Sequence, residues 1–267
     1  MISGGILSSL GLGRKQYRKA VDDVTLTLRR GKVLVLVGES GSGKTTLARL
    51  MLRAVEPDSG SIIFDGDDIT NKSEKGLKYF RKKVQMIHQD PYTSLNPRMT
   101  ILDIVKEPLD IFHKHYSNNE RIEIVLKTLA DVFLDPVIET STKYPYILSG
   151  GQRQRVALAR ALVLMPELII ADEPVSMLDV SIRSEILHLM KKLSIEREIT
   201  YLYITHDLAT SRYIGDEIAV MYAGKIVEMG PAEGILSKPL HPYTQALIQA
   251  VSEFDLSNLS AERIIPI

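Results

Sequence analysis

The stretch GESGSGKT at residues 38–45 constrains the fold of this chain more than any other feature. It matches the pattern G-x-x-x-x-G-K-[ST] and lies between a wholly apolar run, VLVLV at 33–37, and a helical pattern, KTTLARLMLRAV. A strand, a glycine-rich turn and a helix in this order predict a phosphate-binding loop, because the backbone can curl around an anion and offer it N–H groups. The residues predicted to contact a bound nucleotide are Gly38, Glu39, Ser40, Gly41, Ser42, Gly43, Lys44, Thr45 and Thr46.

An acidic motif supplies what a nucleotide-hydrolysing site needs besides the loop. In LIIADEP at 168–174, an apolar strand pattern ends at Asp172, and Glu173 follows it. We expect Lys44 to reach the β- and γ-phosphates, while the Thr45 hydroxyl and Asp172 hold Mg²⁺. Glu173 stands where an attacking water needs a base. The alternative is that the two acids only cap the helix that follows.

Composition excludes several classes of protein. The 267 residues contain 33 basic and 33 acidic side chains, so no overall positive charge points to a nucleic acid or an anionic membrane. There is no cysteine, which excludes disulfides, iron–sulfur clusters and cysteine-ligated zinc. No apolar run approaches the roughly 18 residues that span a bilayer. We therefore predict a cytosolic protein whose role at a membrane comes through a partner.

Hydrophobic periodicity predicts an α/β fold with a mixed sheet. Strand patterns occur at VDDVTLTLRRGK (21–32) and SGSIIFDGDDI, and apolar strands recur at KVQMIHQD, LIIAD, YLYIT, DEIAVMY and KIVEMG. The predicted fold is a P-loop NTPase core that carries an antiparallel β subdomain and a helical subdomain. The predicted boundaries are 1–90 with 166–235 for the ATP-binding core, 91–165 for the helical subdomain and 236–267 for a C-terminal extension.

A second glycine turn, LSGGQRQRVALARAL at 148–162, lies shortly before the acidic motif. It resembles the signature motif of the ATP-binding-cassette (ABC) ATPases, and the other motifs of that family appear in order. Gln89 in IHQDP matches the Q-loop, Asp179 in SMLD matches the D-loop, and His206 in ITHDL matches the switch histidine. The resemblance covers nearly the whole chain and implies the ABC cassette fold.

The resemblance also implies a composite site shared between two cassettes. In ABC proteins two cassettes pack head to tail, and each signature motif closes over the ATP of its partner. The signature residues here would be Ser149, Gly150, Gly151 and Gln152. The alternative is a structural helix start capped by Ser149. Three arginines on this helix either serve the site or form a solvated face: Arg153, Arg155 and Arg160.

The same resemblance implies catalytic roles. Glu173 would polarise the attacking water as general base, and His206 would contact the γ-phosphate and hold water and base in line. Gln89 would touch the metal and the water and sense the γ-phosphate. Asp179 would structure the facing interface. The implied cofactors are ATP and Mg²⁺, and the implied metal-binding residues are Thr45, Gln89 and Asp172.

The segment QDPYTSLNPRMTILDIVKEPL at 89–109 resembles the ATPase subunits of oligopeptide and dipeptide importers, and LNPRMT is more like their F-type than their D-type subunit. HPYTQAL at 241–247 resembles the start of that group's C-terminal extension. The resemblance implies an ATPase on the cytoplasmic face of the membrane, bound to two permease subunits. A paralogous D-type subunit or a second copy would complete the dimer, and an extracytoplasmic binding protein would act indirectly. Other cargoes of the group are nickel and oligosaccharides, and no nucleic acid partner is expected.

Two other interpretations belong to different classes of protein. Soluble ABC ATPases that act on DNA or ribosomes usually have two cassettes or a long coiled-coil insert, and this sequence has neither. A regulatory module that binds ATP without turnover would not need Glu173 and His206. The aromatic residue that stacks on adenine in relatives precedes the segment around Tyr17, so we expect that strand to be missing or to lie upstream.

Overall fold

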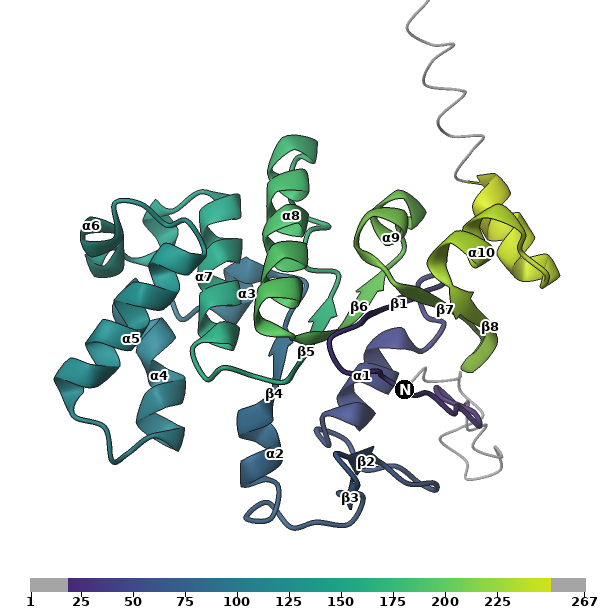
Figure 1. Cartoon of the computed structure of the whole chain (residues 1–267), viewed down its shortest axis with the longest axis horizontal. Coiled ribbons are helices and arrows are strands. Elements are labelled where there is room, and N and C mark those ends of the chain that lie inside the picture. Colours follow the sequence, from purple (N-terminus) through teal and green to yellow (C-terminus); the bar gives the residue numbers. More distant parts are fainter. Residues whose placement is uncertain (1–18, 251–267) are drawn as a thin grey trace, which may run out of the picture.

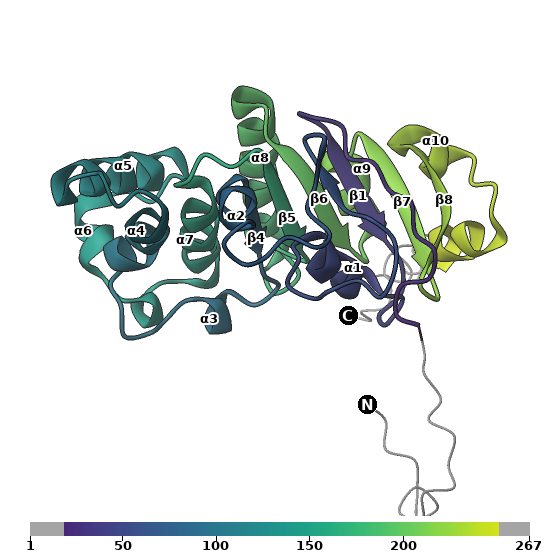
Figure 2. The same cartoon turned by 90° about the horizontal axis from the view of Figure 1, so that it is seen from below.

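The computed structural model describes residues 19–250, and two views of the chain are given in Figures 1 and 2. Tyr17 and residues 251–267 of the predicted C-terminal extension lie outside this described part. Within residues 19–250, no helix combines the length and the apolar character that crossing a membrane requires.

A six-stranded mixed sheet forms the centre of the molecule, in the order β4-β5-β6-β1-β7-β8. Its neighbours are parallel except β7 and β8, which pair antiparallel. The strands are β1 (Val33–Val37), β4 (Val84–Ile87), β5 (Leu168–Asp172), β6 (Thr200–Thr205), β7 (Glu217–Tyr222) and β8 (Lys225–Pro231). The predicted mixed α/β sheet is therefore confirmed, and each strand lies inside one of the predicted strand patterns or extends at most one residue beyond it.

Alternate residues of β1 face two apolar clusters, one on each side of the sheet. Val33, Val35 and Val37 belong to one cluster, while Leu34 and Leu36 belong to the other. Helices cover both faces, as Figure 1 shows, and this explains why β1 is apolar throughout. The first cluster includes residues of α8 (Val180–Arg197), α9 (Leu208–Ile214) and α10 (Ala232–Ser237), and the second includes residues of α1 (Lys44–Met51) and α2 (Lys78–Lys83).

The chain between β4 and β5 is mainly helical, as predicted, and its helices gather at one end of the molecule in both views (Figures 1 and 2). Buried residues of α4, α5 and α7 join the larger cluster on the sheet, so one apolar core continues from the sheet into this helical region. The helices are α3 (Pro91–Ser94), α4 (Ile101–Phe112), α5 (Asn118–Asp131), α6 (Val137–Thr142) and α7 (Gly150–Leu162), with a short 3-10 helix at Pro145–Ile147.

The prediction of a strand over residues 21–32 is wrong. The segment has no strand assignment, although Val24, Leu26 and Leu28 still pack against the apolar cluster that includes α1. The alternating pattern therefore reflected one partly buried face and not a partner in a sheet. The antiparallel β part, apart from β7 and β8, is the short hairpin of β2 (Ile63–Phe64) and β3 (Asp67–Asp68).

Candidate functional site

Four loops that carry predicted site residues leave the same edge of the sheet. Strands β4, β5, β6 and β1 are parallel neighbours, so their carboxyl ends meet at one edge. Gln89 follows β4, Glu173 follows β5, His206 follows β6, and the phosphate loop (residues 38–46) follows β1. This edge is where ligands bind in open parallel sheets. The topology thus brings together residues that are far apart in the sequence.

The phosphate loop turns sharply where it leaves β1. Gly38 has φ 152°, and a Cβ on it would lie 2.2 Å from the carbonyl oxygen of Met221 on β7, so only glycine fits there. Ser42 is buried, and its carbonyl accepts the N–H of Gly224 at 2.9 Å. Glu39, Ser40 and Gly41 are exposed at the tip of the loop, while Lys44, Thr45 and Thr46 form the first turn of α1.

Lys44 is folded into the loop. Its side chain is buried, and Nζ donates to the carbonyl oxygens of Gly38 at 2.7 Å and Glu39 at 2.8 Å. Burial lowers the pKa of Lys44, and the nearby carboxylates of Glu173 and Asp172 oppose that shift. The ammonium is therefore held at the mouth of the loop by two weak carbonyl acceptors, where a phosphate oxygen would be a stronger partner.

Asp172 is the last residue of β5 and is also buried. Burial raises the pKa of this carboxyl, Glu173 raises it further, and a side-chain hydrogen bond with Thr45 and the charge of Lys44 act in the opposite direction. A carboxylate and a hydroxyl are hard oxygen ligands of the kind that Mg²⁺ takes alongside substrate phosphates. The residues present therefore fit the predicted magnesium site.

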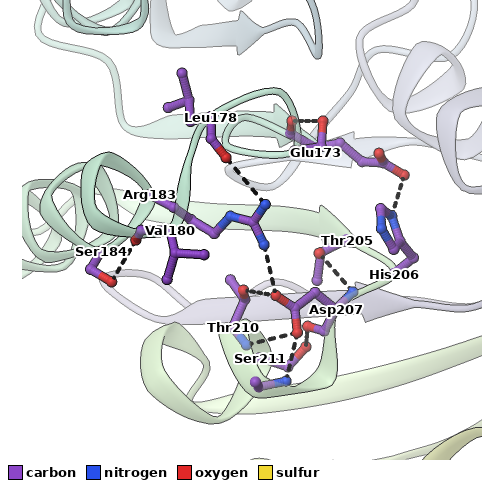
Figure 3. Close-up of polar contacts among 12 residues, drawn as sticks. Glu173, Leu178, Val180, Arg183, Ser184, Thr205, His206, Asp207, Thr210 and Ser211 are labelled. Carbon is purple, nitrogen blue, oxygen red and sulfur yellow. Dashed lines mark hydrogen bonds and ion pairs between the residues drawn. The ribbon is translucent and has the colours of Figure 1, made fainter. Parts of the chain in front are cut away.

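Glu173 is the meeting point of the predicted catalytic residues. One carboxylate oxygen, Oε2, accepts the Nε2–H of Gln89 at 3.0 Å, and the other, Oε1, lies 3.1 Å from Nδ1 of His206 (Figure 3). The backbone of Glu173 has φ 46°, in the left-handed region that non-glycine residues rarely adopt, and its N–H bonds to the Ile204 carbonyl of β6 at 2.9 Å. The strained residue is thus held by the neighbouring strand, and its side chain bridges two loops.

The signature residues open α7 in a reciprocal cap. The Ser149 hydroxyl accepts the N–H of Gln152 at 3.3 Å, and the Gln152 side chain accepts the N–H of Ser149 at 3.0 Å. The structural role considered for Ser149 is therefore present. Both side chains are exposed, which leaves the end of this helix accessible. A Cβ on Gly151 would lie 2.5 Å from Cγ2 of Ile182, so this glycine allows α7 to approach α8 closely.

The three arginines of α7 form more than a solvated face. Each donates to a main-chain carbonyl of the helical region: Arg153 to Pro145, Arg155 to Val132 and Arg160 to Ser94. Arg153 also lies over the ring of Tyr92, 4.2 Å from its centroid. Burial lowers the pKa of Arg160. These contacts hold α7 to the segments around it, a structural task that spacing along the helix does not reveal.

Asp179, the residue that matches the D-loop, caps α8, the helix on which α7 packs. Its carboxylate accepts the N–H of Ile182 at 3.1 Å at the start of α8, and this hydrogen bond lowers the pKa of Asp179. Met177 and Val180 flank it with exposed apolar side chains. The predicted interface residue therefore lies on an accessible turn that is stabilised from within.

Arg183 contacts two of the loops that carry predicted site residues, and the sequence did not indicate it. It donates to the carbonyl of Leu178 in the D-loop at 3.3 Å, and it lies 3.5 Å from the carboxylate of Asp207 (Figure 3). Asp207 directly follows His206 and caps α9 by accepting the N–H of Ala209 at 2.9 Å. One guanidinium thus connects the D-loop to the loop that carries His206. The only sequence signal is an arginine four positions after Asp179.

Comparisons with known proteins agree with this geometry. A family model for ABC transporters matches residues 21–176, and a model for the C-terminal region of oligopeptide/dipeptide transporters matches residues 227–265. Two relatives from Bacillus subtilis are named oligopeptide transport ATP-binding proteins OppF and AppF. They are 49% and 51% identical to this chain over 87% of its length and over 76% and 70% of their own.

Solved structures give the same result. A dimeric ATP-binding cassette in a post-hydrolysis state, bound to ADP and Pi, matches with a TM-score of 0.72 and 31% identity over 80% of this chain and 90% of that one. The protein cbiO1 from Clostridium perfringens, part of the ABC transporter complex cbiONQ, matches with a TM-score of 0.74 and 28% identity over 82% and 84% of the two chains. The nucleotide-binding edge, the ordered motifs and these matches together place the chain in the ABC transporter family, as one of its ATPases.

Proposed function

We propose that this chain is the ATP-hydrolysing subunit of an importer for oligopeptides or dipeptides. The match of residues 227–265 to the C-terminal region of such transporters and the names of the relatives support this cargo. The single observation that carries the catalytic part is the convergence of Gln89 and His206 on Glu173, beside the buried Asp172. The alternative of a soluble ATPase acting on DNA or ribosomes is not favoured by these relatives.

Glu173 acts as general base in this proposal. Its carboxylate accepts a proton from water as the water oxygen attacks the γ-phosphorus and the bond to ADP breaks. Gln89 and His206 hold the two carboxylate oxygens, so the base is oriented before substrate arrives. Orientation of this kind lowers the barrier because no reorganisation is needed during the reaction.

The phosphate loop holds the substrate. The Gly38 and Glu39 carbonyls accept two of the three N–H groups of the Lys44 ammonium, and phosphate oxygens of ATP accept the third. The charge of Lys44 then stabilises the transferring phosphoryl group. Asp172 and Thr45, with Gln89, are the residues that hold Mg²⁺. When bound, this ion draws negative charge from the phosphate oxygens. Main-chain N–H groups of the loop between Ser40 and Thr46 supply the remaining donors.

A second cassette completes the site. Ser149, Gly150, Gly151 and Gln152 reach the ATP of the partner, and Asp179 supports the facing surface. The exposed cap of α7 and the exposed Met177 and Val180 beside the D-loop support this proposal, because a lone cassette gains nothing from apolar side chains there. The partner is a paralogous D-type subunit or a second copy of this chain.

Two permease subunits hold the pair of cassettes on the cytoplasmic face of the membrane. We place their short cytoplasmic helices in the groove between the core and the helical region, near Gln89. A cavity of about 250 Å³ lies between these two parts of the molecule, lined by residues of β4, α4 and α7, among them Met86, Ile111 and Arg160. β4 ends two residues before Gln89, and the side chain of Gln89 donates a hydrogen bond to Glu173. A helix seated in this cavity therefore acts on Glu173 through β4 and Gln89. The extracytoplasmic binding protein acts through the permeases.

The test is transport by the assembled complex. The chain is reconstituted with its permeases, its partner ATPase and binding protein in liposomes, and uptake of labelled oligopeptide and dipeptide mixtures is measured with ATP on the cytoplasmic side. We expect ATP-dependent uptake that is lost with Glu173→Gln. ATP-driven uptake of nickel or oligosaccharide in place of peptides would overturn the cargo and leave the ATPase assignment in place.

A further inference from the structure

The segment that follows α10 is attached to the edge of the sheet by Glu228 of β8. The Glu228 carboxylate accepts the N–H of Leu240 at 2.8 Å and the N–H of His241 at 3.0 Å. Residues 242–250 are helical, and Figure 1 shows this helix beside α10 and β8. His241 Nδ1 accepts the N–H of Tyr243 at 3.1 Å, which fixes the first turn of the helix. The segment is therefore seated on the core and has a defined orientation.

Tyr243 reaches from this segment to the phosphate loop. Its hydroxyl accepts the N–H of Glu39 at 3.0 Å, across 204 positions of sequence. The ring of Tyr243 also packs on Tyr222 at the end of β7, with 4.4 Å between centroids. Burial raises the pKa of the Tyr243 hydroxyl above its ordinary value. A residue of the C-terminal segment thus contacts the loop that the family uses for ATP.

The contact acts on one peptide group. The N–H of Glu39 and the carbonyl of Gly38 belong to the same planar peptide, and in a trans peptide they point in opposite directions. Tyr243 holds the N–H end, and the Lys44 ammonium donates to the carbonyl end at 2.7 Å. Because Gly38 has φ 152° and no side chain, this peptide would rotate easily without partners at both ends.

We propose that Tyr243 is a positioning residue for the phosphate loop, and that the C-terminal segment is thereby part of the ATP site. The Tyr243 hydroxyl fixes the orientation of the Gly38–Glu39 peptide group. The carbonyl of that peptide group in turn fixes the position of the Lys44 ammonium that faces the phosphates. Two hydrogen bonds on one peptide also polarise each other, so the loss of one weakens the other. The inference rests on the proposed function only in that ATP is the ligand of this loop.

The test compares Tyr243→Phe with the control Tyr222→Phe. Both remove one hydroxyl from the same aromatic pair and keep both rings, but only the first removes the acceptor of the Glu39 N–H. We expect Tyr243→Phe to weaken ADP binding, measured by calorimetry, and to raise KM for MgATP, each about five-fold, the scale of one hydrogen bond. Its kcat should stay within about two-fold of wild type, since the groups around Glu173 are unchanged.

Three outcomes would overturn the inference. They are unchanged ADP binding and KM in Tyr243→Phe, an equal loss in Tyr222→Phe, or a fall in kcat with KM unchanged. Melting temperatures of the two nucleotide-free variants should agree, which separates positioning from a general loss of stability. A complex that imports no peptide while Tyr243→Phe still weakens ADP binding would refute the proposed cargo and leave this inference intact.

Discussion

His206 Nδ1 lies 3.1 Å from Oε1 of Glu173, although 33 positions separate the two residues in sequence. The contact exists because β5 and β6 are adjacent parallel strands whose carboxyl ends are in register, Asp172 opposite Ile204. The residue after each strand therefore faces the other across the edge of the sheet. The proposed base and the residue proposed to orient it are thus positioned by the sheet itself.

Glu173→Gln should keep ATP binding and lower turnover by about 10²-fold or more, because an amide cannot accept the proton of the attacking water. The variant should also accumulate as an ATP-bound dimer, since the nucleotide at the interface is no longer cleaved. Phosphate release and size-exclusion chromatography with ATP check the two outcomes. The control is Glu196→Gln, which removes an exposed carboxylate of α8 that pairs only at 3.8 Å with Lys192. Normal hydrolysis by Glu173→Gln would remove Glu173 from the role of base.

Asp172→Asn should raise the melting temperature of the nucleotide-free protein at neutral pH while it abolishes Mg²⁺-dependent turnover. Burial raises the pKa of Asp172 above its ordinary value of 3.8, so the native state binds this proton more tightly than the unfolded chain does. The ionised carboxylate therefore costs stability at neutral pH. That cost disappears as the pH falls through the raised native pKa, and it is fully absent below the ordinary value.

The same prediction gives a pH signature. The stability gained by Asp172→Asn over wild type should be largest at neutral pH and should shrink as the pH falls towards the ordinary pKa of an aspartate. Thermal melts of both proteins without nucleotide, from neutral pH down to the acid limit of solubility, measure this difference. A gain that stays constant with pH would show that the ionisation of Asp172 is not its source.

Ser149→Arg should leave nucleotide binding to its own phosphate loop intact and abolish hydrolysis at the site of its partner. Lys44→Ala should instead lose nucleotide binding, because the loop loses the charge that faces the phosphates. Each variant alone should be inactive. A mixture should regain part of the activity, since a mixed dimer contains one site with an intact loop and an intact signature motif.

The experiment is run at high protein concentration, where two copies of the chain associate, and phosphate release is measured for each variant and for the mixture. Hydrolysis by wild type should also rise more steeply than linearly with protein concentration, because each site needs a second Ser149. An inactive mixture of two folded variants, or a rate per molecule that is unchanged on dilution, would argue against sites shared between two copies.

Arg183→Met should lower kcat about three-fold and leave ATP affinity nearly unchanged, because a partly exposed ion pair of this kind is worth about 1 kcal/mol or less. Methionine keeps the aliphatic stem but loses the bond to the Leu178 carbonyl and the contact with Asp207. Steady-state kinetics and calorimetry with ADP check the prediction. The control is Arg212→Met on α9, which removes an exposed pair with Glu233 at 3.9 Å. Equal kcat values for both variants and wild type would exclude Arg183 from positioning the His206 loop.

The local parts of the proposed site can be located from the sequence alone. Lys44 and Asp172 lie in motifs whose flanking strand and helix are adjacent in sequence, so spacing alone places them. Gln89, Asp179 and His206 needed the family pattern, because nothing near them shows which strand lies beside β5. Once the sheet order is known, the convergence of Gln89 and His206 on Glu173 follows from the register of parallel strands, whereas Asp179 caps α8.

Contacts that join distant segments through single side chains were not predictable. The hydrogen bond between Tyr243 and Glu39 spans 204 positions, and no periodic pattern in the sequence indicates that the two residues are in contact. The contact of Arg183 with Asp207 has the same character. The strand expected over 21–32 failed for a related reason, since alternation records which side is buried and gives no information about a hydrogen-bonding neighbour.

The close packing of α7 on α8 has a consequence for how a partner cassette is sensed. A Cβ on Gly150 would lie 3.4 Å from the Leu178 side chain, and a Cβ on Gly151 would clash with Ile182. The start of the signature helix and the D-loop therefore form one contiguous surface, built from the helical region and the sheet core together. A rotation of the helical region that moved the start of α7 without the D-loop would open a gap at Gly150 and Gly151. If a partner cassette contacts this surface as we propose, its contact bears on the orientation of the helical region and of the sheet core together.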